Sequence, residues 1–228
     1  MTKIMLIAGH GAGDCGAVGK YDGKTYCERD EARLVVAEVA ARLKKANAEI
    51  IVRDPSRNAY TDYKAGKLAL PKLDALIEIH FNALSASNKD GKTKGVECYI
   101  PASETKTGLA DALCAAVSRA GLTNRGTKRY NWAVITAAKK NGVNAALLEV
   151  CFIDDPDDMS VYTTQFSAIC EAIAQAIIVQ LGLTVKKQMD AEVVQERAGL
   201  SDATMDYLRK YRWGGDLIKK LATAIRGY

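Results

Sequence analysis

Short apolar runs alternate with longer segments of helical apolar spacing along most of the chain. Ile4–Ile7, Leu76–Ile79 and Ala145–Val150 are apolar except for one acidic residue in each of the last two, and such runs predict buried strands. Between them, apolar residues recur every three or four positions in segments such as 32–43 and 109–117, which predicts amphipathic helices. This alternation predicts an α/β domain with a twisted, mostly parallel sheet flanked by helices.

The chain contains only two histidines, and each lies where an apolar run ends. His10 stands between two glycines shortly after the first run, and His80 immediately follows Ile79. Functional sites of open α/β sheets form at the carboxyl ends of the strands. One histidine in such a position is as readily structural as functional, but two in equivalent positions favour a shared functional site.

Two carboxylates complete this candidate site. Glu149 interrupts an apolar strand, where a carboxylate is costly unless it is paired or bound to a metal. Glu28 begins the helix over 32–43, where the helix dipole alone would favour an acid, so its spacing leaves a structural and a functional role open. Two histidines and a carboxylate form the ligand set of a catalytic zinc site, and a further carboxylate beside it serves as general base.

The end of the chain has a different pattern and is expected to form a separate module. We place one domain over residues 1–183, a linker over 184–189 and a small all-α module over 190–228. The module is small for independent stability, so docking or self-association through it is expected. Its turn at Ala198–Ser201 is similar to that of helix-turn-helix DNA-binding proteins, but nothing else points to DNA, and no nucleic-acid partner is expected.

Three aromatic residues, Tyr207, Tyr211 and Trp213, lie close together in this module. Aromatic rings either pack a small core or present an apolar face to a ligand, and their spacing leaves both interpretations open. From position 185 onward the chain has nine basic and six acidic residues, so the module carries a basic excess.

Composition and charge indicate a globular protein without a membrane-spanning segment. Apolar residues make up 48% and charged residues 26% of the chain, as in ordinary globular proteins. The net charge of +5 suits a polyanionic surface without requiring nucleic acid. No apolar stretch is long enough for membrane insertion, and no signal segment precedes the first strand, so synthesis in the cytoplasm without a signal peptide is expected. The basic segment Thr123–Asn131 is typical of a solvated loop.

The six cysteines show no CxxC spacing, which argues against a cysteine zinc site. Cys98, Cys114 and Cys170 fall in apolar patterns and are expected to be reduced core residues. Cys15 and Cys27 lie in the loop after the first strand, and a disulfide between them, conceivable under oxidation, is not the expected state.

The order and spacing of several short motifs resemble those of one enzyme family. Over residues 1 to about 183 the chain resembles the zinc-dependent N-acetylmuramoyl-L-alanine amidases of the amidase-3 type, which occur in bacterial autolysins and phage endolysins. Each motif alone is weak, and their order together is specific. The motifs are Ala8-Gly9-His10-Gly11, Glu28 opening a helix, Ile79-His80-Phe81-Asn82-Ala83, Gly95-Val96-Glu97, Asn124-Arg125-Gly126 and Leu148-Glu149-Val150-Cys151-Phe152-Ile153.

The resemblance implies a function and a set of site residues. The implied reaction is hydrolysis of the amide bond between N-acetylmuramic acid and L-alanine in peptidoglycan, on the cell wall after release, which for a phage enzyme occurs through holin pores. For the C-terminal module, which lies outside the resemblance, a wall-targeting role with Tyr207, Tyr211 and Trp213 as contacts is then more economical than DNA binding. The implied site residues are His10, Glu28 and His80 as ligands of one zinc ion, Glu149 as the catalytic carboxylate, and Asn82, Asn124 and Arg125 as substrate contacts.

The sequence departs from the family pattern in two places. Glu78 replaces the usual serine two positions before the second histidine. Residues two apart on a strand share a face, so Glu78 is placed to accept a hydrogen bond from behind His80 or to pair with a basic residue. An Arg-x-x-x-Asn pattern is absent from Tyr60–Leu70. Two other functions remain open, a zinc peptidase acting on stem peptides and a non-catalytic wall-binding protein on the same fold.

Overall fold

The computed structural model describes residues 1–84, 92–185 and 190–226, which fall into two compact units. The first unit is Met1–Val185 and the second is Lys186–Tyr228. Val185 forms an isolated bridge with Ala46, and Thr184 accepts a hydrogen bond from Asn47, so these two residues belong to the first unit. The rest of the expected linker, residues 186–189, lies outside the described residues.

Six strands of the first unit form one sheet in the order β4-β1-β5-β8-β6-β7. All neighbouring strands are parallel except β6 and β8, which are antiparallel, so the prediction of a mostly parallel sheet is confirmed. The strands are β1 (Thr2–Ala8), β4 (Ala48–Val52), β5 (Ala75–Asn82), β6 (Val96–Ile100), β7 (Asn124–Arg129) and β8 (Asn144–Phe152).

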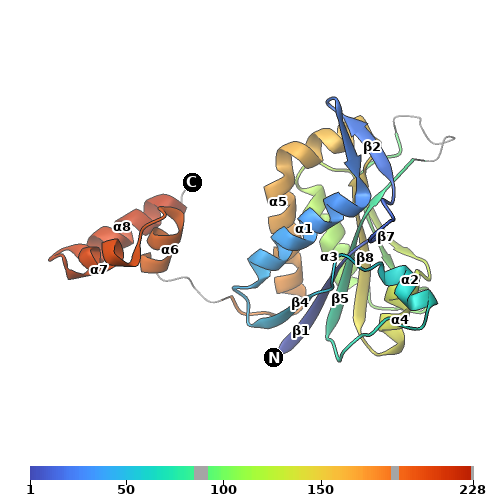
Figure 1. Ribbon diagram of the computed structural model, residues 1–228, viewed down its shortest axis with the longest axis horizontal. Helices are drawn as coiled ribbons and strands as arrows, with labels where there is room; N and C mark the ends of the chain where they lie inside the picture. Colours follow the sequence, from blue (N-terminus) through green and yellow to red (C-terminus); the bar gives the residue numbers. More distant parts are fainter. Residues whose placement is uncertain (85–91, 186–189, 227–228) are drawn as a thin grey trace. The chain divides into compact units, whose positions relative to one another are not determined.

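Helices cover both faces of this sheet (Figure 1). Three pack over one face around the larger apolar core, and two shorter ones pack over the other face around a smaller core. The helices of the first face are α1 (Glu28–Leu43), α3 (Gly108–Ser118) and α5 (Pro156–Gln180), and those of the second are α2 (Ala59–Lys64) and α4 (Ala133–Lys140).

The two faces of the central strands differ in polarity, and this difference positions the site. On β5, Ile77, Ile79 and Phe81 belong to the larger core, whereas the alternate residues Glu78 and His80 point to the α2/α4 face. Only the amino-terminal part of that face is apolar. The carboxyl ends of the strands therefore carry ionisable residues on the face that the shorter helices cover.

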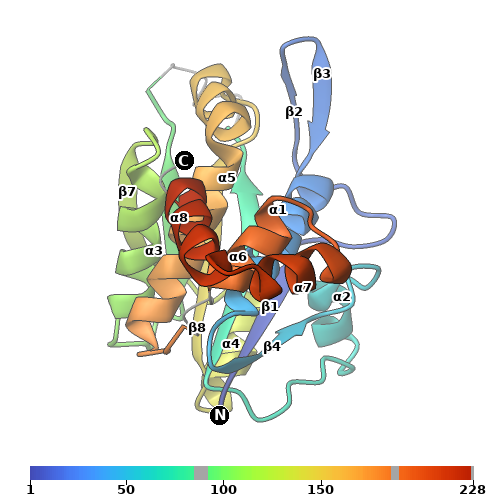
Figure 2. The ribbon, with the colours of Figure 1, turned by 90° about the vertical axis from the view of Figure 1, so that its left-hand side faces the viewer.

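A hairpin of β2 (Val18–Tyr21) and β3 (Lys24–Cys27) precedes α1 and extends away from the sheet (Figure 2). Its turn uses Asp22 and Gly23, both with positive φ, as expected of a tight hairpin turn. The hairpin returns the chain to its starting point and joins Cys27 to Cys15 in a disulfide. The expectation of reduced thiols at these two positions was therefore wrong, because it treated the segment as a loop and not as a closed hairpin.

The other cysteines and the basic segment give one confirmation and one correction. Cys98, Cys114 and Cys170 are free and buried, as predicted.

The basic segment Thr123–Asn131 is not a loop, since β7 occupies most of it at the edge of the sheet. Edge strands tolerate and often use charged residues, so the polarity of this strand concealed it.

The second unit contains α6 (Asp190–Arg197), α7 (Asp202–Lys210) and α8 (Gly214–Arg226) around a small core of its own. Ser201 caps α7 through a hydrogen bond from the Thr204 backbone. Tyr207, Tyr211 and Trp213 are exposed to 72%, 53% and 57%, so these rings do not pack the core. Among the helices that the structure describes, none is long and apolar enough to cross a membrane.

Candidate metal centre and adjoining pocket

Glu28 joins the two histidines at the carboxyl edge of the sheet. Its Oε1 lies 2.8 Å from His80 Nδ1, and its Oε2 lies 3.0 Å from His10 Nε2. The backbone N–H groups of Phe81 and Ala17 donate to the same two oxygens and fix the carboxylate in place. Three elements thus converge: His10 follows β1, Glu28 opens α1, and His80 lies near the end of β5.

Glycines permit this close assembly. A Cβ on Gly9 would come within 2.4 Å of the His80 ring, and one on Gly16 within 2.6 Å of both Glu28 and His10. His10 itself has a φ of 65°, an uncommon conformation for a residue with a side chain, which is often found at functional sites. The loop between β1 and the hairpin is therefore shaped around these three side chains.

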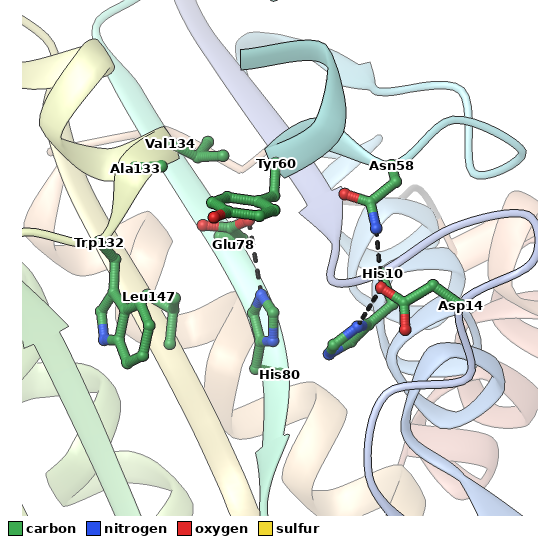
Figure 3. A pocket seen from close by; sticks show the side chains of 10 residues that line it. All are labelled: His10, Asp14, Asn58, Tyr60, Glu78, His80, Trp132, Ala133, Val134 and Leu147. Atoms are coloured by element: carbon green, nitrogen blue, oxygen red, sulfur yellow. Dashed lines mark hydrogen bonds and ion pairs between the residues drawn. The ribbon is translucent and has the colours of Figure 1, made fainter. Parts of the chain in front are cut away.

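Two further carboxylates lie behind the histidines (Figure 3). Asp14 Oδ2 lies 2.9 Å from His10 Nδ1 and also accepts a hydrogen bond from the Asn58 amide. Glu78 Oε1 lies 3.4 Å from His80 Nε2, within ion-pair range but without hydrogen-bond geometry. Sequence reasoning identified Glu78 as a candidate and missed Asp14, whose only signal was its place four residues after His10 in a glycine-rich loop.

The electrostatics of this cluster suit a metal cation. Burial alone would raise the pKa of Glu28, but hydrogen bonds from both histidines lower it. Burial opposes the charged form of His80, yet Glu28 and Glu78 raise its pKa well above the usual value. One ligand atom from each of His10, Glu28 and His80 lies within 4.8 Å of the others. The donor set of two imidazoles and a carboxylate fits zinc, and these three residues could hold it.

Glu149 lies next to this cluster on the central strand. In the sheet register it pairs with His80 of β5 on one side and with Glu97 of β6 on the other. Its side chain is buried, and its Oε2 has no hydrogen-bond partner within the described chain. Burial raises the pKa of Glu149 to about 7, in the range that suits a general base at neutral pH.

A cavity of about 270 Å³ opens beside the histidines (Figure 3). Its walls combine polar groups from the metal centre with apolar and aromatic groups from α2, α4 and β8. Tyr60 and Trp132 are 55% and 42% exposed, so their rings are accessible at its rim. The lining residues are His10, Asp14, Asn58, Tyr60, Glu78, His80, Trp132, Ala133, Val134 and Leu147.

The expected substrate contacts are only partly brought together. The Asn82 amide and the Arg125 guanidinium both donate to the buried carboxylate of Glu97. Asn124 does not join them, because its side-chain oxygen accepts a hydrogen bond from the Gly126 backbone within the local turn. The sequence analysis included Glu97 in a family motif but assigned it no role, since a polar residue in an alternating strand is normally a solvated one.

Comparisons with known proteins relate the first unit to amidases. A family model described as N-acetylmuramoyl-L-alanine amidase, Amidase_3, matches residues 4–179. Proteins named "Probable cell wall amidase LytH" from Staphylococcus epidermidis and Staphylococcus aureus are 31% identical over 176 residues. The match covers 77% of this chain and 55% of each relative, so the chain spans about half the length of the curated relatives it matches.

Solved structures of amidases share the fold of the first unit. The catalytic domain of CwlV, from Bacillus (Paenibacillus) polymyxa var. colistinus, has a TM-score of 0.63 at 23% identity and covers 81% of this chain and 100% of that domain. The CwlD amidase of Clostridioides difficile, solved with the GerS lipoprotein, has a TM-score of 0.65 at 20% identity over 80% of this chain and 99% of CwlD. Since the family model spans most of the chain, the protein belongs to the Amidase_3 family of N-acetylmuramoyl-L-alanine amidases.

Proposed function

We propose that the first unit hydrolyses the amide bond between N-acetylmuramic acid and L-alanine in peptidoglycan. The observation that carries this proposal is the convergence of His10, Glu28 and His80 with the buried Glu149 beside them. Membership of the amidase family supports the same bond as the target.

His10, Glu28 and His80 would hold one zinc ion per chain. Asp14 behind His10 and Glu78 behind His80 would orient the two imidazoles, since metal-bound histidines usually donate their other nitrogen to a carboxylate or carbonyl. When bound, zinc supplies a Lewis acid for the amide carbonyl and lowers the pKa of water to about 7.

Glu149 would be the catalytic carboxylate. Because Glu149 is buried and its Oε2 has no hydrogen-bond partner among the described residues, it is placed to take a proton from the attacking water. The same carboxyl then returns that proton to the nitrogen of L-alanine, which allows the C–N bond to break with a neutral amine as the leaving group. Burial keeps the pKa of Glu149 high enough for both transfers.

Product analysis on purified peptidoglycan tests this reaction. The zinc-loaded protein is expected to release stem peptides with a free N-terminal alanine and to leave the glycan strands intact. New amino groups on other residues would indicate a zinc peptidase. Binding of the wall without any new amino group would indicate a non-catalytic wall-binding protein.

We further propose that the second unit binds the wall. Tyr207, Tyr211 and Trp213 are exposed, and the guanidinium of Arg212 lies 5.2 Å from the centre of the Trp213 ring. Exposed aromatic faces suit sugar rings and other apolar ligand surfaces. A fluorescent fusion of residues 186–228 is expected to label purified walls, and replacement of all three aromatics by alanine is expected to abolish labelling. Light scattering on the same fusion tests self-association.

The place of action follows from the substrate. The protein would meet peptidoglycan on the cell wall after release from the cytoplasm, through holin pores if it comes from a phage. Fractionation of producing cells before and after membrane permeabilisation tests this, because wall digestion is expected only after permeabilisation.

A further inference from the structure

Glu97 is the centre of a second buried charge cluster in the first unit. Its side chain is 1% exposed, yet it accepts four hydrogen bonds. Asn82 and the Tyr99 hydroxyl each donate to Oε1 at 2.8 Å, while Arg125 and Lys128 both donate to Oε2. All acceptor sites of the carboxylate are thus occupied, and Glu97 itself has none left for a ligand.

The cluster lies at the end of a row of neighbouring residues that crosses the sheet from the candidate metal centre. His80, Glu149 and Glu97 are register partners on β5, β8 and β6. A register shift between Val96 and Cys98 leaves two residues of β7, Arg125 and Gly126, opposite Glu97. The row therefore runs from the candidate metal ligand, through the candidate catalytic carboxylate, to a cationic end.

This end of the row carries an excess of positive charge. One carboxylate faces two cations, and a single cation would already compensate the charge of Glu97. The side chains of Arg125 and Lys128 remain 25% and 38% exposed. Arg125 uses its Nε for Glu97, and within the described chain its two terminal nitrogens have no hydrogen-bond partner.

We propose that Arg125 and Lys128 form a subsite for a carboxylate of the stem peptide, and that Glu97 is the positioning residue that holds both cations in place. This inference rests on the proposed amidase function. It names a substrate group that the protein would bind in addition to the scissile bond. A planar guanidinium with free terminal nitrogens suits a carboxylate, because two parallel N–H bonds match its two oxygens.

The distances along the sheet are compatible with this assignment. Neighbouring strands lie about 4.8 Å apart, so the backbones of Glu149 and Arg125 are separated by about 10 Å. Two residues of extended peptide span about 7 Å, and the arginine side chain extends over the remainder. A carboxylate on the second residue of the stem therefore falls within reach of the subsite when the first residue is at Glu149.

The test compares two soluble substrates that differ only in charge. One is a muramoyl dipeptide whose second residue carries two free carboxylates, and the other is its diamide. The full-length, zinc-loaded protein is expected to cleave the dicarboxylate with a kcat/KM about tenfold higher, mainly through a lower KM. Added salt is expected to reduce this preference because the two cations are partly exposed.

Variants assign the preference to the subsite. R125Q and K128M are each expected to remove most of the tenfold preference by raising KM for the dicarboxylate. R129Q, which removes an exposed charge from the same strand, is the matched control and is expected to keep the preference. E97Q is expected to weaken the preference for the dicarboxylate although both cations are still present. This result would show that Glu97 acts by positioning Arg125 and Lys128.

Two outcomes would overturn the inference, and only the second would also contradict the amidase function. Equal kcat/KM for both substrates, or an equal loss on both in R125Q, contradicts the carboxylate subsite and leaves the amidase function intact. Cleavage of neither substrate by the folded, zinc-loaded protein contradicts the amidase function, and the subsite inference with it.

Discussion

Two buried carboxylates of the first unit, Glu28 at the start of α1 and Glu97 on β6, have opposite charge environments. Around Glu28, two histidines are surrounded by further carboxylates from Asp14 and Glu78. Around Glu97, a single carboxylate is surrounded by two permanent cations and two neutral donors. The first cluster has too little positive charge, and the second has more than its carboxylate requires.

The difference indicates what each cluster is built to receive. Isolated charges are costly to bury, so an acidic cluster with neutralisable imidazoles calls for a metal cation. The cluster around Glu97 is stable without a ligand, and its remaining charge points to an anionic one. Burial alone therefore does not show whether a carboxylate belongs to a cation site or to an anion site. The charges of its hydrogen-bond and ion-pair partners show this.

The largest effect is expected from H80A, which removes a ligand from the acidic cluster. Zinc content measured by mass spectrometry is expected to fall from one per chain to near zero, with activity lost and the circular dichroism spectrum unchanged. Full zinc occupancy in the folded variant would contradict the ligand assignment and weaken the contrast between the clusters.

The next largest effect is expected from E149Q, between the two clusters. The amide cannot act as a general base, so turnover is expected to fall by about a hundredfold or more. Zinc content is expected to remain at one per chain, since Glu149 is not a proposed ligand. Near-normal turnover would remove Glu149 from the mechanism.

E97Q tests whether the second cluster stabilises the fold by itself. Breaking a buried ion pair costs about 3 kcal/mol of unfolding free energy at neutral pH, and we expect a loss of that order. Burial raises the pKa of Glu97, but hydrogen bonds from Arg125 and Lys128 lower it overall. Its contribution is therefore full above the unfolded pKa of about 4.3 and is lost as the pH falls through the lower folded pKa.

Denaturant titrations of the wild type and E97Q at several pH values measure this effect. The difference in unfolding free energy is expected to shrink below about pH 4. A difference that stays constant through this range would mean that the charge of Glu97 does not contribute. E49Q, which removes an exposed carboxylate paired with Lys3, is the control and is expected to change stability by less than about 1 kcal/mol.

A smaller effect is expected from D14N in the acidic cluster. Loss of the carboxylate behind His10 is expected to weaken zinc affinity by about 10- to 100-fold without abolishing binding. Competition with a chelator measures the affinity. D30N removes a more exposed carboxylate near the start of α1 and is expected to leave zinc affinity unchanged. Equal affinities in D14N and the wild type would show that Asp14 does not orient the histidine.

The smallest effect is expected from truncation after Val185. Both clusters consist of residues before position 150, so cleavage of a soluble muramoyl peptide is expected to stay within about twofold of the full-length rate. Activity on intact walls is expected to fall, because the second unit would no longer raise the local concentration. Loss of soluble-substrate cleavage in a folded truncation would make the second unit part of the site.

The sequence alone indicated the α/β fold and placed His10, His80 and Glu149 in one candidate site, because the signals for both are local. Strand and helix periodicities can be recognised within a short stretch of sequence. A carboxylate such as Glu149 in an apolar run can be recognised in the same way, because burying it is costly. Placing His10 and His80 at strand ends needed only the rule that parallel strands share one functional edge. For Glu28 the sequence left two roles open, because a helix dipole explains an acid there equally well, and only the family resemblance favoured a ligand role.

Only the tertiary structure decided which distant groups meet. The hydrogen bonds from Asn58 to Asp14 and from Arg125 and Lys128 to Glu97 join residues 44, 28 and 31 positions apart. These pairings depend on strand order, on the bulge opposite Glu97 and on the hairpin that joins Cys15 to Cys27. Local periodicity determines which face a side chain occupies, whereas register and strand order determine its partner, and the chemistry of a buried charge depends on that partner.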